Sequence, residues 1–262
     1  MDHNPMYHES SVFFELITAW LFVAVFVLYI GAAMASSRYS HLRTWPLHRY
    51  VFWFLGVLCA TASVVGPLAD RAHTDFTAHM IGHLLLGMLA PLLLVLAAPM
   101  TLLLRTINVH TARRLSRVLK SWPVRIPSHP VVASILNIGG LWVLYTTGVY
   151  VAMQQNMFLH LVVHFHVFVA GYLWTLSMIY IDPTPHRFSF VYRAIVLVTA
   201  LAGHGILSKY MYAQPPPGVP IAQAELGGLL MYYGGDAIDM VLIFILCLHW
   251  FKATRPRMTV AV

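Results

Sequence analysis

Residues 76–96 read FTAHMIGHLLLGMLAPLLLVL, and this stretch decides the fold. It holds 21 residues and no Asp, Glu, Lys or Arg. A helix of that length is about 30 Å long, which matches the thickness of the hydrocarbon core of a bilayer. The stretch therefore predicts a membrane-spanning helix, and it carries two histidines, His79 and His83, within that span.

The composition of the whole chain points the same way. Of its 262 residues, 59% are hydrophobic and 10% are charged, whereas an ordinary soluble domain has about 45–50% and about 25%. So much apolar surface excludes a soluble monomer and a disordered chain, and two cysteines are too few for a disulfide scaffold. The composition predicts an all-α, polytopic membrane protein.

Seven stretches are long and apolar enough to span the membrane, and we expect them to form one transmembrane domain over residues 1–262. The predicted spans are 11–35, 50–67, 74–96, 130–151, 157–181, 190–212 and 228–251. The loop between the third and fourth spans contains residues 102–120, in which leucines and basic side chains are interspersed. This segment is interpreted either as an amphipathic cytoplasmic helix at the membrane surface or as a solvated basic loop.

The basic residues predict the orientation. All lysines and arginines except Arg71 and Lys209 fall in loops or span ends on one side of the predicted membrane, and such residues accumulate on the cytoplasmic side. We therefore expect the N-terminus outside and the C-terminus in the cytoplasm, in a bacterial inner membrane. The accumulation of Lys and Arg on the cytoplasmic side of a membrane accounts for the net charge of +7. No nucleic-acid partner is therefore expected.

Polar side chains within the spans gather at one predicted depth. His79 and His83 lie four residues apart, as do His160 and His164, so each pair lies on one helix face. Alternate spans run in opposite directions, which places both pairs in the outer half of the bilayer. A histidine in the sixth span and two carboxylates in the seventh fall at the same level. The full set is His79, His83, His160, His164, His204, Asp236 and Asp239.

This convergence predicts a metal site, because ionisable residues within spans are costly and usually functional. We interpret the histidines as ligands and the two carboxylates as groups that orient the imidazoles, with direct ligation by the carboxylates as an alternative. Imidazole binds copper, zinc and iron, and several methionines at this level favour copper as Cu(I). Haem held by histidines of facing helices is the main rival. Histidines that only bond to neighbouring helices are the structural alternative.

A longer segment, FTAHMIGHLLLGMLAPLLLVLAAPMTLLLR at 76–105, carries a family resemblance. Five further segments agree with it in order: GPLAD at 66–70, HLVVHFHVFVAGYLW at 160–174, IDPTP at 181–185, GHGILSKY at 203–210 and YYGGDAIDM at 232–240. Together they resemble the CtaG family of seven-span integral-membrane cytochrome c oxidase assembly factors. The resemblance covers most of the chain from about residue 56 onward.

The resemblance implies a function in producing active haem-copper oxidase, through copper delivery or insertion. It implies oxidase subunits as partners, and periplasmic copper carriers are the expected donors. Because metal transfer by ligand exchange requires no turnover, we expect an assembly factor rather than an enzyme. A membrane oxidoreductase that uses haem or a metal at the same histidines is the alternative. A metal permease is a third class, and the apolar inner halves of the spans, such as LLLVL at 92–96, argue against it.

The orientation is testable with a reporter that is active only in the cytoplasm. Fusions within 113–120 or after Arg257 are expected to be active, and a fusion at Pro216 is expected to be silent. The reverse pattern would place the histidines in the inner leaflet and remove their access to periplasmic copper.

Overall fold

The computed structural model describes residues 5–38, 43–184 and 186–256, and every regular element within them is a helix. The prediction of an all-α fold is thus confirmed for this part of the chain. The long helices are α1 (Pro5–Ser37), α2 (Leu47–Val64), α12 (Met157–Met178), α13 (Phe190–Ala213) and α14 (Ile221–Thr254). The third predicted span consists of α4 (Phe76–Leu84), the π-helical turn η1 (Leu85–Leu89) and α5 (Ala90–Leu96).

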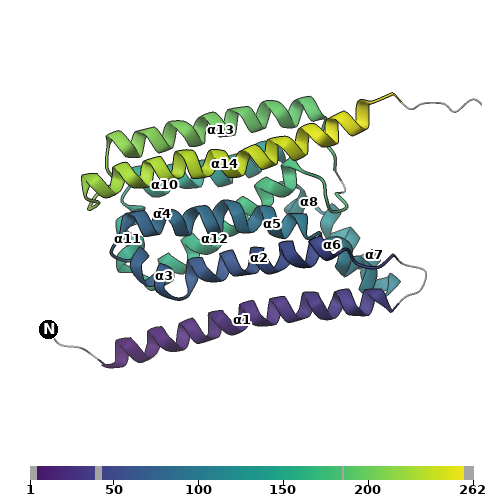
Figure 1. The fold of residues 1–262 in the computed structure, drawn as a ribbon, viewed down its shortest axis with the longest axis horizontal. Coiled ribbons are helices and arrows are strands. Elements are labelled where there is room, and N and C mark those ends of the chain that lie inside the picture. Colours follow the sequence, from purple (N-terminus) through teal and green to yellow (C-terminus); the bar gives the residue numbers. More distant parts are fainter. Residues whose placement is uncertain (1–4, 39–42, 185, 257–262) are drawn as a thin grey trace, which may run out of the picture.

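Figure 1 shows these helices lying roughly side by side, with α1 at one edge and α13 and α14 at the opposite edge. The segment Phe76–Leu96 lies between α2 and α14 and is the most buried of the candidate spans. The stretch that decides the fold therefore forms the centre of the bundle. Short helices cover its two ends: α3 (Pro67–Ala72) and α11 (Val149–Gln155) at one, and α6 (Pro99–Thr106), α7 (Val109–Lys120) and α8 (Trp122–Arg125) at the other.

The described residues contain six single helices that are long and apolar enough to span a membrane, and up to seven spans when one bent pair is included. The number is consistent with the seven predicted spans. The bent pair is the fourth predicted span, 130–151, which is not one continuous helix. It consists of α9 (Pro130–Ser134), the π-helical turn η2 (Ile135–Gly139) and α10 (Gly140–Thr146), and it meets α11 at an angle of 78°.

Two threonines explain this break. Thr147 has an extended backbone, and the hydroxyls of Thr146 and Thr147 donate hydrogen bonds of 2.6 Å to the carbonyls of Trp142 and Val143. A helix end leaves such carbonyls without backbone partners. The side chains occupy two carbonyls near the end of α10, so the straight part of this span ends at Thr146 and the chain continues into α11 after a bend.

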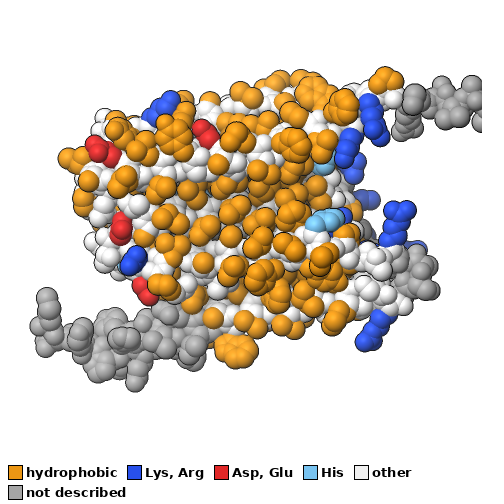
Figure 2. Space-filling model, viewed as in Figure 1, with side chains coloured by type: hydrophobic (Ala, Val, Ile, Leu, Met, Phe, Trp, Pro, Cys, Tyr) orange, Lys and Arg blue, Asp and Glu red, His pale blue; other side chains and the backbone are white. Residues whose placement is uncertain are grey.

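The basic segment 102–120 also differs from a single helix. Its first residues belong to α6, where Leu102 is buried in the core rather than placed at an interface. A new helix, α7, begins after Asn108, whose side-chain oxygen accepts a hydrogen bond of 2.8 Å from the Thr111 amide. Figure 2 shows basic side chains gathered at this end of the molecule and acidic ones toward the opposite end, with an apolar belt between them.

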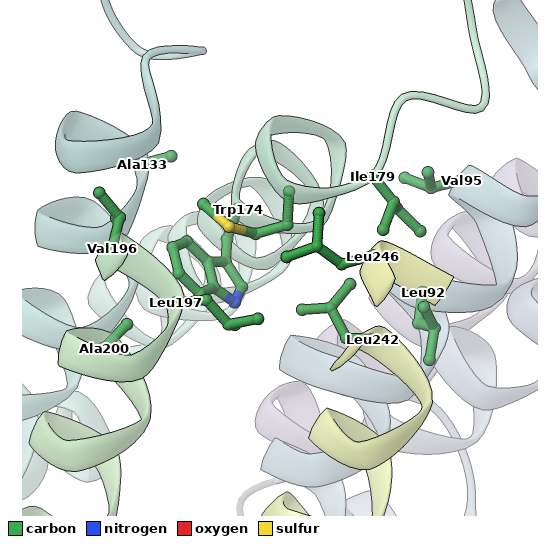
Figure 3. Packing of buried hydrophobic residues seen from close by; sticks show 11 residues of the cluster. Leu92, Val95, Ala133, Trp174, Ile179, Val196, Leu197, Ala200, Leu242 and Leu246 are labelled. Atoms are coloured by element: carbon green, nitrogen blue, oxygen red, sulfur yellow. The ribbon is translucent and has the colours of Figure 1, made fainter. Parts of the chain in front are cut away.

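Apolar clusters pack at both ends of the bundle. At the basic end, Trp174 of α12 packs among leucines of α13 and α14, as Figure 3 shows. At the other end, Phe76, Met80 and Tyr145 form a second cluster with residues of α13 and α14. Between them α12 packs closely on η1, because a Cβ atom at Gly171 would collide with the carbonyl oxygen of Gly87. This packing brings the histidine-bearing helices α4 and α12 together.

Candidate metal centre

The two predicted histidine pairs face each other across α4 and α12. The imidazole rings of His160 and His164 are stacked with centroids 4.1 Å apart. The ring of His79 lies almost perpendicular to that of His164, with a centroid distance of 6.3 Å. His83 and His164 line one small cavity with His79, and the cavity has a volume of about 10 Å³. All four histidines of the two pairs are thus brought together.

One hydrogen bond determines the protonation of His164. Its Nδ1 lies 2.9 Å from the carbonyl oxygen of His160 in the preceding turn. Since a carbonyl only accepts, Nδ1 carries the hydrogen, and in a neutral ring Nε2 then keeps a lone pair. This is the protonation state in which imidazole binds a metal, and it is fixed by a contact outside the ligand position.

His79 is held by two tyrosines from the fourth span and α11. Its Nε2 lies 3.1 Å from the hydroxyl of Tyr145, and both side chains are buried. The ring of Tyr150 packs against it at a centroid distance of 5.1 Å. The break between α10 and α11 places these two tyrosines around one imidazole. Their bulk limits how far His79 is free to turn.

Several buried imidazole nitrogens lack a hydrogen-bond partner. Within the predicted spans they are Nε2 of His83, Nδ1 of His160 and Nε2 of His204. A buried polar atom without a partner costs about 1–3 kcal/mol, and such atoms are uncommon in folded proteins. Each of these nitrogens is able to bind a metal ion or a small polar ligand. The donor set present therefore fits a metal that prefers imidazole.

The remaining predicted residues lie elsewhere. His204 and Asp239 are buried and line a second small cavity together with Asn137 and Met88. A Cβ atom on Gly235 would lie 2.5 Å from Cε1 of His204, so glycine is required at this position for the ring to fit. Asp236 is exposed on the surface of α14 and lines neither cavity.

The residues that are predicted to form one metal site at one depth thus do not line a single cavity, because the structure divides them between two. In the part of the chain that the structure describes, no three His, Cys, Asp or Glu side chains are grouped closely enough to hold one ion. The imidazoles meet in pairs, and any ion held by the side chains in these positions has few protein ligands.

Three residues near these cavities were not anticipated. His73, which precedes α4, stacks on His160 at 5.0 Å, and Tyr145 and Asn137 line the two cavities. Polarity was the available signal for Tyr145 and Asn137, because both lie within an apolar span. His73 lies outside the spans and outside the i, i+4 pattern, so spacing alone does not identify it.

A π-helical turn adjoins each cavity. The turn η1 begins two residues after His83, and η2 contains Asn137. Such turns interrupt α-helices frequently at functional sites, where the extra residue displaces side chains from their regular positions. Their occurrence here, in the two spans that line the cavities, supports a functional interpretation of both.

The bond between Tyr145 and His79 gives a stability prediction. Tyr145→Phe should lower the free energy of unfolding by about 1–3 kcal/mol, because it leaves Nε2 of His79 buried without a partner. Tyr233→Phe is the matched control, since Tyr233 is 67% exposed, and it should change stability by less than about 0.5 kcal/mol. Thermal unfolding of the purified protein in detergent compares the two variants, and equal stability would contradict the bond.

The chain is similar to one protein family and to several mycobacterial proteins. The model of the cytochrome c oxidase caa3 assembly factor family (Caa3_CtaG) matches residues 5–253. An uncharacterized protein of Mycobacterium bovis is 30% identical over 205 residues, and one of Mycobacterium leprae is 28% identical over 203 residues. Each alignment covers 72% of this chain but 31% of the relative, so the chain spans about a third of the length of these relatives.

No solved structure matches the chain significantly. The family match extends over nearly all of the described residues, including both cavities and all seven predicted metal-site residues. It therefore rests on the membrane-spanning bundle itself. The chain belongs to the family of cytochrome c oxidase caa3 assembly factors.

Proposed function

We propose that this protein binds copper as Cu(I) in the outer half of a bacterial inner membrane and aids its delivery to a haem-copper oxidase. The observation that carries the proposal is the meeting of His79, His160 and His164, beside buried imidazole nitrogens that have no partner. Membership of the assembly-factor family supplies the acceptor, the oxidase. The orientation, with the N-terminus outside, follows from the Lys and Arg bias and belongs to the same proposal.

The separation of the rings supports an ion bound between two imidazoles. With a metal–nitrogen bond of about 2 Å, two imidazoles that bind one ion in line have centroids roughly 6 Å apart. His79 and His164 are separated by 6.3 Å. Cu(I) accepts low coordination numbers and adds only one positive charge to a dry site, where burying charge is costly. His83 lines the same cavity, and we assign it the role of an alternative partner that replaces one of these two imidazoles rather than that of a simultaneous third ligand.

We assign the second cavity the role of a second binding position for Cu(I). His204 and Asp239 line it, and Met88 adds a thioether, which suits Cu(I). We assign Asp239 the role of orienting His204 or balancing the charge of an ion. Asp236 is exposed and lines neither cavity, so we assign it no ligand role.

Haem is the weaker alternative. The cavity between His79, His83 and His164 has a volume of about 10 Å³, which is about the room that one water molecule needs. A single ion fits such a space and a macrocycle does not.

Ligand exchange with an acceptor needs no turnover, so we propose that the protein acts as a carrier rather than as an enzyme.

Copper binding is testable on the purified protein. Competition with a Cu(I)-specific chromophoric chelator should show that His164→Ala weakens Cu(I) binding by about 10–100-fold, because it removes one of two facing imidazoles. His83→Ala should also weaken it. His110→Ala is the control, since His110 lies on the exposed helix α7. Binding that is unchanged in the His164 and His83 variants would make these histidines packing residues.

Delivery is testable in cells. Deletion of the gene should leave the haem-copper oxidase present but low in activity when copper limits growth, and added copper should restore part of that activity by mass action. His79→Ala combined with His83→Ala should match the deletion, while His110→Ala should behave as the wild type. An oxidase that stays fully active in the deletion strain at limiting copper would refute the delivery role.

A further inference from the structure

Two adjoining cavities lie at the basic end of the molecule, away from the histidine pairs. The enclosed one has a volume of about 100 Å³ and a largely apolar lining that includes Leu119, Tyr172 and Leu176. The open one has a volume of about 650 Å³. Basic side chains line the open cavity: Arg125, His129, His186 and Arg187. Both cavities share Arg125, His186 and Phe188, so a basic opening leads into an apolar interior.

The loop between α12 and α13 holds its basic groups in place. The backbone amide of Phe188 donates a hydrogen bond of 3.0 Å to the Tyr180 hydroxyl, and the guanidinium of Arg187 lies 5.9 Å from the centre of the Tyr180 ring. The His129 imidazole packs edge-on against Phe188 at 4.6 Å. Its Nδ1 is buried and has no hydrogen-bond partner within the described residues, so it is able to form a hydrogen bond with a polar group of a ligand at the basic opening.

The acidic residue of the cavity lining does not neutralise these cations. Asp182 accepts hydrogen bonds from the Met100 amide at 3.1 Å, from the Thr101 amide at 2.7 Å and from the Thr101 hydroxyl at 2.6 Å. Its carboxylate oxygens are therefore directed at α6. The positive charge of Arg125 and Arg187 is left for a ligand.

We propose that this cavity binds an anionic phospholipid, with the phosphate between Arg125 and Arg187 and the apolar part of the lipid in the enclosed cavity. Arginine binds phosphate through paired, charge-assisted hydrogen bonds. The site lies where spans end, beside Trp122 and Ile126, which are 71% and 47% exposed. Exposed tryptophans are typical of the membrane interface, and basic pockets between spans bind acidic headgroups. Free phosphate has the same charged group as the lipid headgroup, but it has no apolar part that would fill the apolar cavity.

The test measures lipid retention. The protein is reconstituted in vesicles of roughly four parts phosphatidylcholine to one part phosphatidylglycerol and then extracted in mild detergent. Native mass spectrometry measures the mass of the protein with any lipid that it retains. Wild type should keep one phosphatidylglycerol. Arg125→Gln combined with Arg187→Gln should lose it by at least about tenfold. Arg113→Gln combined with Arg117→Gln removes the same charge from α7, outside both cavities, and should retain the lipid.

Other outcomes would overturn the proposal. Equal loss in both double variants would mean non-specific attraction to a basic surface. Binding of inorganic phosphate alone, with no preference for phosphatidylglycerol over phosphatidylcholine, would mean a free-phosphate site. A photoactivatable phosphatidylglycerol gives a measurement on the wild type that is independent of folding of the variants. Its acyl chain should label α12 around Tyr172 and Leu176, and labelling elsewhere would contradict the assigned cavity.

Discussion

Inside hydrocarbon a polar nitrogen has no water to bond, and every imidazole in the spans has to meet that constraint. His166 meets it simply, since its Nε2 donates to the carbonyl oxygen of Leu136 at 3.1 Å. Such a bond ties two helices together and needs no ligand. Among the imidazoles of the predicted spans, the buried nitrogens without a partner in the described part of the chain belong to His83, His160 and His204. They lie on three different helices, and these helices line the two cavities. Their lack of a partner distinguishes these three histidines from His166, which only bonds to a neighbouring helix.

The same constraint explains how far hydropathy predicts the fold. Lipid requires spans of a certain length and apolarity, so the central segment Phe76–Leu96 is identified from sequence alone. The fourth span was the exception, because its end at Thr146 depends on threonine hydroxyls that bond to carbonyls of their own helix. Those bonds change the backbone without changing the hydropathy. The π-helical turns η1 and η2 likewise cannot be predicted from hydropathy, because both lie within apolar stretches.

Spacing predicts which residues share a helix face, but it does not predict how the helix is rotated toward its neighbours. Asp236 and Asp239 are three residues apart, and only Asp239 is buried beside a cavity. The rotation of α14 is restricted by Gly235, where the ring of His204 comes too close for any side chain. The division of the predicted site into two cavities has the same origin. His79 and His204 are at one depth in the prediction, but their rings line different cavities.

If the protein carries copper as proposed, a site with two imidazole ligands suits transfer of the ion better than a site with a full set of four ligands. An ion enclosed by four fixed ligands is held tightly and is slow to leave. Between His79 and His164 an ion would have two imidazoles, and an acceptor is able to supply the next ligand before either one leaves. His160 stacks on His164 at 4.1 Å with its buried Nδ1 unpaired. That nitrogen would offer a bound ion a neighbouring position, and release would then proceed by successive exchange of single ligands.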